Sequence, residues 1–239
     1  MNHARSGGLP HFSDFKQVLF FTGAGLSAES GLPTYRGSGG IWREYNYEDY
    51  ACQRAFEADP DKVWDFHDAR RAMVARCEPN PGHGVIAALQ QAQPATRVVT
   101  QNIDGLHQRA GATGVVELHG SLWRVRCEQE SIIRPDFTVP FTPRRCTCGA
   151  WWRPDIVWFE DALNPLTLSA AREALAQCDL LVTVGTSGVV YPAADLPRIA
   201  TRRGIPSVEI NLEDTDVSHL YQYRPRGKAS EILAQMAAT

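Results

Sequence analysis

Five short apolar segments, each followed by glycine or small polar residues, constrain the fold of this chain more than any other feature. They are rich in branched side chains and occupy residues 17–21, 97–100, 115–118, 180–184 and 207–212. Segments with helical spacing of apolar residues lie between them, at 61–76, 83–93, 166–177, 193–203 and 229–236. This alternation predicts an α/β fold, a Rossmann-like parallel sheet with helices on both faces.

One stretch breaks the alternation. Residues from about 120 to 154 are rich in Arg, Pro, Cys and Trp and show no amphipathic helical pattern. We interpret this stretch as a small inserted module. The chain has 239 residues, enough for one sizeable core but too few for a second full domain, so we expect a single domain over residues 1–239 that carries the insertion.

The charge balance limits the classes of partner. The 24 basic and 27 acidic residues give a formal charge of -3 and are spread along the chain, so no nucleic-acid partner is expected. No apolar run is long enough to span a membrane, and the first 16 residues lack the apolar core of a signal peptide. We therefore expect a cytoplasmic protein without a membrane partner. The oligomeric state stays open, and a monomer is compatible with the sequence.

A glycine-rich turn follows the first apolar segment. In TGAGLSAES, residues Gly23, Gly25 and Ala28 have the GxGxxG/A spacing of dinucleotide-binding turns, in which glycines let a pyrophosphate approach the backbone. A tight strand-to-helix turn also needs glycine, so this pattern alone is weak. A dehydrogenase would place an acidic residue after a second strand about 20 residues later. Residues 35–49 instead form an aromatic segment, which disfavours hydride transfer.

Polar residues follow the later apolar segments. Gln101, Asn102 and Asp104 lie together in TQNIDGLH, and amide and carboxylate groups of this kind can hold a carboxamide and ribose hydroxyls. His119 ends the next segment, and its imidazole suits proton transfer near neutral pH. A solvated turn and a structural histidine are the plainer alternatives. Because the carboxyl ends of parallel strands meet at one edge, we expect a binding crevice there.

The ordered motifs TGAGLSAESGLPTYRG, TQNIDGLH, ELHG, RPDIVWF, VGTSGVVYP and INLE resemble the sirtuin family along nearly the whole chain. The chain looks closest to the bacterial deacylases that group with the mammalian mitochondrial desuccinylase. The resemblance implies an enzyme that consumes NAD to remove acyl groups from lysines of partner proteins, releasing nicotinamide, O-acyl-ADP-ribose and free lysine. Protein ADP-ribosylation and a non-catalytic sensor of acyl-lysine or NAD are the alternatives.

The resemblance also implies roles for individual residues. His119 falls on the catalytic histidine, which takes a proton from a ribose hydroxyl after the acyl-lysine oxygen has attacked the nicotinamide ribose. Arg36 would lie near that ribose, and the positions matching Asn102 and Asp104 hold the nicotinamide amide, so Asn102 and Arg36 are counted with His119 as catalytic residues. Residues matching the NAD-binding positions are Gly23, Ala24, Gly25, Ser27, Ala28, Tyr35, Arg36, Trp42, Gln101, Asn102, Ile103, Asp104, Gly185, Thr186, Ser187, Asn211, Leu212, Glu213 and Ala229.

Substrate contacts follow from the same resemblance. The two strips that pair with the substrate peptide match Val157, Trp158 and Phe159 on one side and Val189 on the other. The acyl pocket matches Ala51, His67 and Arg70, with histidine where desuccinylase-like sirtuins have tyrosine. An arginine there can bind an acyl carboxylate, so we expect deacetylation with some removal of malonyl or succinyl groups. A plain core strand and a solvated helix face are the alternatives.

Zinc binding is left open by the cysteines. Most sirtuins hold a structural zinc with two CxxC pairs. This chain has Cys127 and Cys146 at zinc positions, but Cys127 lacks the other cysteine of its pair, and Cys148 follows Cys146 one residue too early. The incomplete ligand set favours a metal-free loop, derived from a zinc ribbon. Buried structural thiols are expected at Cys52, Cys77 and Cys178.

Overall fold

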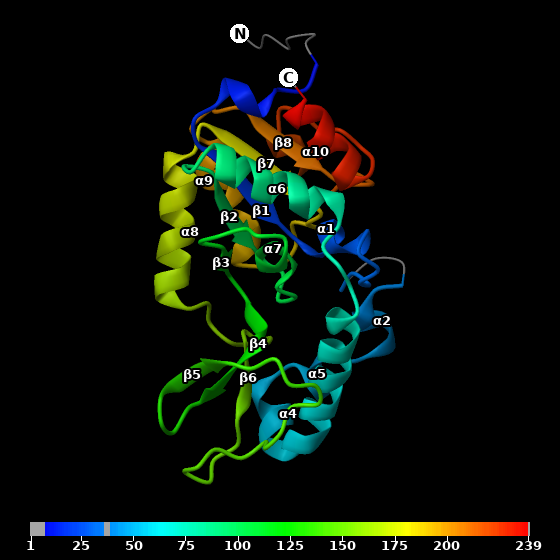
Figure 1. Ribbon diagram of the computed structural model, residues 1–239, viewed down its shortest axis with the longest axis vertical. Helices are drawn as coiled ribbons and strands as arrows, with labels where there is room; N and C mark the ends of the chain where they lie inside the picture. The colour runs from blue at the N-terminus through cyan, green and yellow to red at the C-terminus, as the bar shows by residue number, and fades with distance from the viewer. Residues whose placement is uncertain (1–7, 36–38, 239) are drawn as a thin grey trace.

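The computed structural model describes residues 8–35 and 39–238 and has two parts, each built around its own sheet (Figure 1). The strands of the larger part are β1 (Val18–Thr22), β2 (Arg97–Thr100), β3 (Val116–Glu117), β7 (Leu180–Val184) and β8 (Ser207–Ile210). They form a five-stranded, wholly parallel sheet with the order β3-β2-β1-β7-β8. The smaller part has an antiparallel sheet with the order β5-β4-β6, made of β4 (Gly120–Cys127), β5 (Ile132–Pro135) and β6 (Arg153–Ile156).

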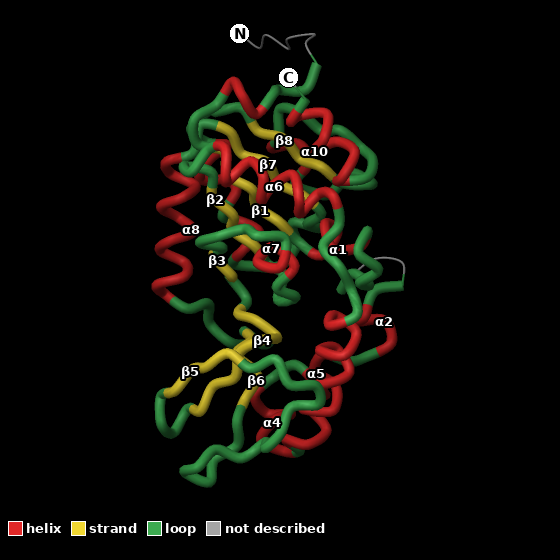
Figure 2. The backbone as a smooth tube through the Cα atoms, in the orientation of Figure 1, coloured by secondary structure: helices red, strands yellow, loops and turns green. Residues whose placement is uncertain are grey.

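The helices are α1 (Ala24–Ala28), α2 (Ile41–Glu44), α3 (Tyr47–Tyr50), α4 (Gln53–Ala58), α5 (Pro60–Ala75), α6 (Pro81–Ala92), α7 (Leu106–Arg109), α8 (Pro165–Gln177), α9 (Pro197–Thr201) and α10 (Ala229–Ala237). Figure 2 shows the helices in red, with α4 and α5 beside one side of the small sheet and most of the others packed around the parallel sheet. Short 3-10 turns lie at Phe12–Asp14, Ala193–Asp195 and Ser218–Leu220. Within the described ranges, no helix combines the length and apolar character needed to cross a bilayer.

The parallel sheet is buried on both faces, which confirms the predicted fold class. Alternate side chains of β1 point to opposite faces, so Val18 and Phe20 pack with α6 and α10, and Leu19 and Phe21 pack with α8 and α9. All residues of β1 and β7 are buried. This two-sided burial explains why these segments are continuous apolar runs rather than alternating ones.

The three longest helices begin in the same way. An Asx side chain accepts a hydrogen bond from a backbone N–H of the first turn, and a proline occupies the first helical position, where no N–H is needed. The pairs are Asp59-Pro60 for α5, Asn80-Pro81 for α6 and Asn164-Pro165 for α8. Proline also explains one wrong expectation. The helix expected over residues 193–203 is divided into a 3-10 turn and α9, because Pro197 starts a new helix.

The smaller part has a separate core. It joins the antiparallel sheet to α4 and α5, and its centre is Trp64, whose ring stacks on Phe141 at 4.4 Å between centroids. The Trp64 indole N–H donates to the Trp152 carbonyl at 2.7 Å. A buried ion pair between Arg71 and Asp136, 2.9 Å apart, ties α5 to the loop after β5. The inserted residues therefore share their core with helices that precede them by about 60 residues in the chain.

Candidate functional site

The glycine turn after β1 packs directly against the end of β7. The Gly23 N–H donates to the Val184 carbonyl at 2.9 Å, and the Gly25 N–H donates to the Gly185 carbonyl at 2.8 Å. A Cβ atom on Gly25 would lie 2.6 Å from the Gly185 Cα atom. The contact between two backbones therefore requires glycine at Gly25, whether or not a pyrophosphate also approaches this turn.

A buried polar cluster lies beside this turn. Asn102 and Asp104 are only 4% and 7% exposed, although both carry strongly polar groups. The Asn102 side-chain amide donates to the Gly23 carbonyl at 3.0 Å, and the Ser27 hydroxyl donates to the Asp104 carboxylate at 2.7 Å. Burial raises the pKa of Asp104 above its ordinary value. These groups are held in place before any ligand arrives, an arrangement suited to binding an amide.

A small cavity extends from this polar cluster. Both polar and apolar side chains line it, those of Ala24, Ser27, Leu32, Pro33, Tyr35, Arg70, Val74, Asn102, Ile103, Asp104 and Leu122. Leu32 and Pro33 lie within the motif TGAGLSAESGLPTYRG, whereas the sequence did not indicate Val74 or Leu122. These residues come from separate segments, and no local pattern distinguishes them from ordinary apolar residues. Polar atoms with apolar walls match the chemistry of a flat aromatic amide.

His119 lies one residue before β4, with its ring half-buried. Its Nδ1 atom lies 3.0 Å from the Gln101 carbonyl oxygen, so this nitrogen carries the proton and donates, and Nε2 keeps a free lone pair. Burial lowers the pKa of His119 below its ordinary value, and the hydrogen bond to Gln101 opposes that shift. The imidazole is therefore neutral near pH 7 and can accept a proton at Nε2.

The ends of β2, β7 and β8 meet through Thr186. The Gln101 side-chain amide donates to the Thr186 hydroxyl at 2.9 Å, and the Asn211 amide donates to the Thr186 carbonyl at 3.1 Å. Ser187, Leu212 and Glu213 are exposed beyond these strand ends. Of the remaining residues matched to NAD positions, Ala28 ends α1, Ala229 begins α10 and Trp42 lies in α2. Arg36 falls outside the described residues.

The residues matched to the acyl pocket are buried. His67 is 4% exposed and Arg70 is 9% exposed, so the alternative of a solvated helix face is wrong. The Trp158 indole N–H donates to His67 Nε2 at 3.2 Å, and burial, aided by the nearby Arg70 charge, lowers the pKa of His67 to about 3. The Arg70 guanidinium lies 5.3 Å from the centroid of the Tyr35 ring. His67 is thus neutral and faces Trp158, while Arg70 supplies positive charge to the small cavity.

The segment matched to the peptide-binding strip has its backbone N–H groups already engaged. Val157 donates to the His119 carbonyl, Phe159 donates to the Ala51 carbonyl, both at 3.0 Å, and Trp158 donates to the Asp161 carboxylate at 3.1 Å. Val189, on the opposite strip, is exposed. The N–H groups of these three residues are therefore not free to pair with an added peptide strand.

Three cysteines of the smaller part meet in space. The sulfur atoms of Cys127, Cys146 and Cys148 all lie within 4.8 Å of one another. Thiolates bound at roughly 2.3 Å to a tetrahedral zinc are about 3.8 Å apart. The close spacing of Cys146 and Cys148 in sequence does not keep either away from Cys127, so the three thiols fit three corners of a zinc site. Cys148 was not among the predicted ligands.

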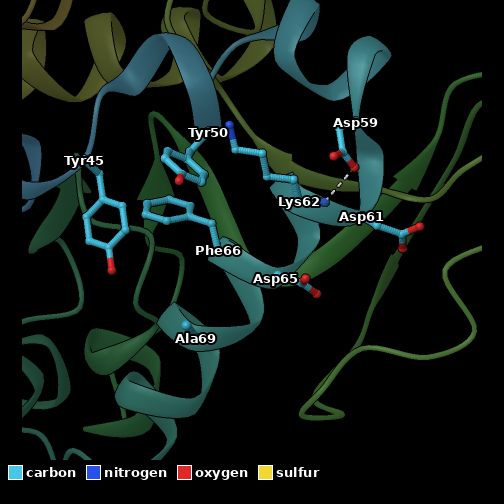
Figure 3. Close-up of a pocket in the computed structure, with 8 residues that line it drawn as sticks. All are labelled: Tyr45, Tyr50, Asp59, Asp61, Lys62, Asp65, Phe66 and Ala69. Carbon is cyan, nitrogen blue, oxygen red and sulfur yellow. Dashed lines mark hydrogen bonds between the residues drawn. The ribbon is translucent and has the colours of Figure 1, made fainter.

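A second cavity has a different lining, although its Phe66 ring contacts the rings of Trp42 and His67. It measures about 470 Å³ and is lined by Tyr45, Tyr50, Asp59, Asp61, Lys62, Asp65, Phe66 and Ala69, none of which lines the small cavity beside Asn102 and Asp104 (Figure 3). Its rings pack against one another at 5.0–5.5 Å between centroids. Two of its carboxylates, those of Asp61 and Asp65, are paired with Arg144. Cavity size therefore does not identify the candidate active site of this molecule.

Comparison with known proteins agrees with this geometry. A model of the Sir2 family matches residues 23–192. The NAD-dependent protein deacylase 2 of Pyrobaculum aerophilum is 45% identical over 223 residues, which cover 92% of this chain and 90% of that protein. The mitochondrial NAD-dependent protein deacylase sirtuin-5 of Canis lupus familiaris is 37% identical, covering 95% of this chain and 83% of its own. The crystal structure of a Sir2 homolog-NAD complex superposes with a TM-score of 0.87 at 37% identity, covering 98% of this chain and 96% of the other.

Proposed function

We propose, from the premise that this chain belongs to the Sir2 family, that it removes acyl groups from the lysine side chains of proteins and consumes NAD in doing so. One observation carries the proposal. The glycine turn at Gly23, the buried Asn102 and Asp104 cluster and the neutral His119 converge at one edge of the parallel sheet. Acyl-lysine proteins are the partners that this activity requires.

The polar cluster supplies the expected contacts for NAD. When bound, NAD provides a ribose carbon from which nicotinamide can leave. Asn102 and Asp104, fixed by Ser27, would hold the nicotinamide amide, and the turn from Gly23 to Ala28 would hold the pyrophosphate. Burying two such polar side chains costs free energy unless their hydrogen bonds are made. A ligand that engages their remaining donor and acceptor positions offsets that cost.

His119 acts as the general base in this proposal. Its Nδ1–H group is held by the Gln101 carbonyl, which fixes the ring and leaves Nε2 to accept a proton. That proton would come from a ribose hydroxyl of bound NAD, next to the ribose carbon at which the acyl-lysine oxygen has displaced nicotinamide. The hydroxyl oxygen would then bond to the acyl carbon, and a water molecule would supply the atoms that free the lysine amine and leave the acyl group on ADP-ribose. General-base assistance of this kind accelerates a reaction by roughly a hundredfold to ten-thousandfold.

Acyl selectivity follows from the pair on α5. Arg70 can bind the carboxylate of a malonyl or succinyl group, because its guanidinium forms two parallel hydrogen bonds with such a group. His67 stays neutral at physiological pH, and its Nε2 already accepts from Trp158, so it adds no charge to the pocket. We therefore propose that the enzyme removes acetyl groups and, to a smaller extent, the two acidic acyl groups.

The test is a panel of lysine peptides incubated with NAD. Acetyl, propionyl, lactyl, malonyl, succinyl and lipoyl peptides are compared, and products are weighed by mass spectrometry. The expected result is unmodified lysine together with nicotinamide and O-acyl-ADP-ribose. A protein that gains ADP-ribose while the lysine keeps its acyl group would replace the proposal with ADP-ribosyl transfer. A protein that binds NAD without releasing nicotinamide would be a sensor.

A further inference from the structure

The three clustered cysteines are brought together by a tight turn. Cys127 ends β4, while Cys146 and Cys148 lie in a turn whose backbone is closed by two hydrogen bonds, from the Cys146 N–H to the Ala150 carbonyl at 2.8 Å and from the Gly149 N–H to the Cys146 carbonyl at 2.9 Å. Gly149 has a φ of +89°, a conformation that side-chain-bearing residues seldom adopt. The turn therefore directs both thiols toward the end of β4.

The sulfur positions fit a metal site better than a disulfide. Cys127 and Cys148 have their sulfur atoms 3.6 Å apart, close to the spacing of about 3.8 Å expected around a tetrahedral zinc. The third thiol, that of Cys146, joins the same group. A disulfide would use only two of these thiols and would leave the third without a partner. Three converging thiols are instead the donor set that zinc-class ions prefer.

A fourth protein ligand is missing from this group. In residues 8–35 and 39–238, no histidine, aspartate, glutamate or further cysteine joins the three thiols within ligand distance. Glu130 stands where a CxxC pair with Cys127 would place its second cysteine, and it is exposed and outside the group. Cys127 and Cys146 are buried, whereas Cys148 is half-exposed. The uncovered side of the site is therefore the side next to Cys148.

We propose that Cys127, Cys146 and Cys148 form a three-thiolate site for one zinc-class divalent ion, whose fourth coordination position is taken by an exchangeable ligand from solvent. Structural zinc sites normally have four protein ligands, while an open fourth position is typical of sites that exchange ligands. The ion therefore holds the module together and also binds small donor molecules. This proposal is independent of the deacylase activity, and none of its measurements uses that activity.

The first measurement is the metal content of the purified chain. We expect about one zinc per chain in the wild type and loss of zinc in Cys148→Ser, because two thiolates are too few for a stable site. Cys77→Ser is the matched control, since Cys77 is also half-exposed but lies outside the cluster. A wild type that stays metal-free in zinc-supplemented medium, with its three cluster thiols open to a thiol reagent, would overturn the proposal.

The second measurement tests the open position with cobalt(II) as a spectroscopic substitute for zinc. Imidazole added to the cobalt protein should shift the visible d–d bands, because it replaces the solvent ligand. Glu130→Cys should remove that shift by supplying a fourth thiolate. It should also strengthen metal binding in a chelator competition by about tenfold or more, since changes outside the ligand shell alone alter affinity about 10–100-fold. A wild-type spectrum that imidazole leaves unchanged would show a closed site.

Discussion

The two parts of the molecule gather their important residues by different means. At the edge of the parallel sheet, β2 and β3 pair in register, with Thr100 opposite Glu117, so the residues that follow each strand arrive side by side. In the smaller part, Trp64 of α5 meets Trp152 across 88 positions of sequence, without a shared strand register. The first arrangement follows from topology, and the second follows from side-chain packing. Substitutions at the sheet edge should therefore lower activity without changing the free energy of unfolding. Substitutions in the core of the smaller part should lower the free energy of unfolding as well.

The largest effect is expected for His119→Ala, which tests the first half of this comparison. Removal of the general base should lower the deacylation rate by about a hundredfold to ten-thousandfold. The ring makes one hydrogen bond and is only half-buried, so the thermal unfolding temperature should change little. Single-turnover rates and thermal unfolding curves measure the two quantities.

The matched control for this variant is His219→Ala, because His219 is exposed and lies far along the chain, in the 3-10 turn Ser218–Leu220. It should keep full activity. A His119→Ala enzyme that retains its deacylation rate would remove His119 from the mechanism. A His119→Ala protein that unfolds instead would show that a residue at the sheet edge is needed for stability as well as for activity.

The next largest effect is expected for Trp64→Ala, which tests the second half. Trp64 is fully buried, stacks on Phe141 and donates to Trp152. Large-to-small substitution of such a residue costs about 3–5 kcal/mol of unfolding free energy. Denaturant titration gives this value.

Phe137→Ala is the control for size, because Phe137 is 72% exposed in the same part of the molecule. Its substitution should change the unfolding free energy by about 0.5 kcal/mol or less. Equal losses in the two variants would contradict a core centred on Trp64.

The same contrast explains what could be predicted from the sequence. Buried apolar runs with polar residues at their carboxyl ends predicted three features. These are the parallel sheet, the alternation of strands and helices along the chain, and the convergence of Asn102 with the glycine turn. The division of the helix at Pro197 could have been predicted from the proline itself and was missed. The position of the Cys148 thiol did not follow from the sequence, because it depends on the backbone geometry of its turn. The cavity wall at Leu122 and the core around Trp64 also escaped prediction, since packing between distant segments has no local pattern in a single sequence.

A smaller and more selective effect is expected for Arg70→Met. Hydrogen bonds to a charged group contribute about 1.5–3 kcal/mol, which is roughly tenfold to a hundredfold in a rate or binding constant. The kcat/KM ratio of succinyl to acetyl peptide should fall by about that factor. Arg76→Met is the control, since Arg76 is exposed at the end of α5. Equal loss on both peptides would refute a carboxylate-binding role and place Arg70 among the structural residues.

The smallest effect is expected in the pH dependence of kcat/KM. His119 must be neutral to accept a proton, and burial lowers its pKa below the unperturbed value of about 6.5. Activity should therefore stay level from pH 8 down past about pH 6.5 and fall only at lower pH. A profile that already falls above pH 7 would show that His119 is charged more easily than its surroundings suggest.

Acid unfolding must be separated from this activity limb, because other histidines are also buried. Burial lowers the pKa of His83 to about 4 and the pKa values of His67 and His107 to about 3. Since the unfolded chain binds these protons from about pH 6.5 downward, the stability that these neutral histidines contribute is fully present above that pH and is lost as the pH falls toward their folded pKa values. Thermal unfolding measured at each pH should decline gradually over this range. A loss of activity while the protein remains folded would assign the activity decline to His119 at the sheet edge, whereas a loss that follows unfolding would assign it to the buried histidines.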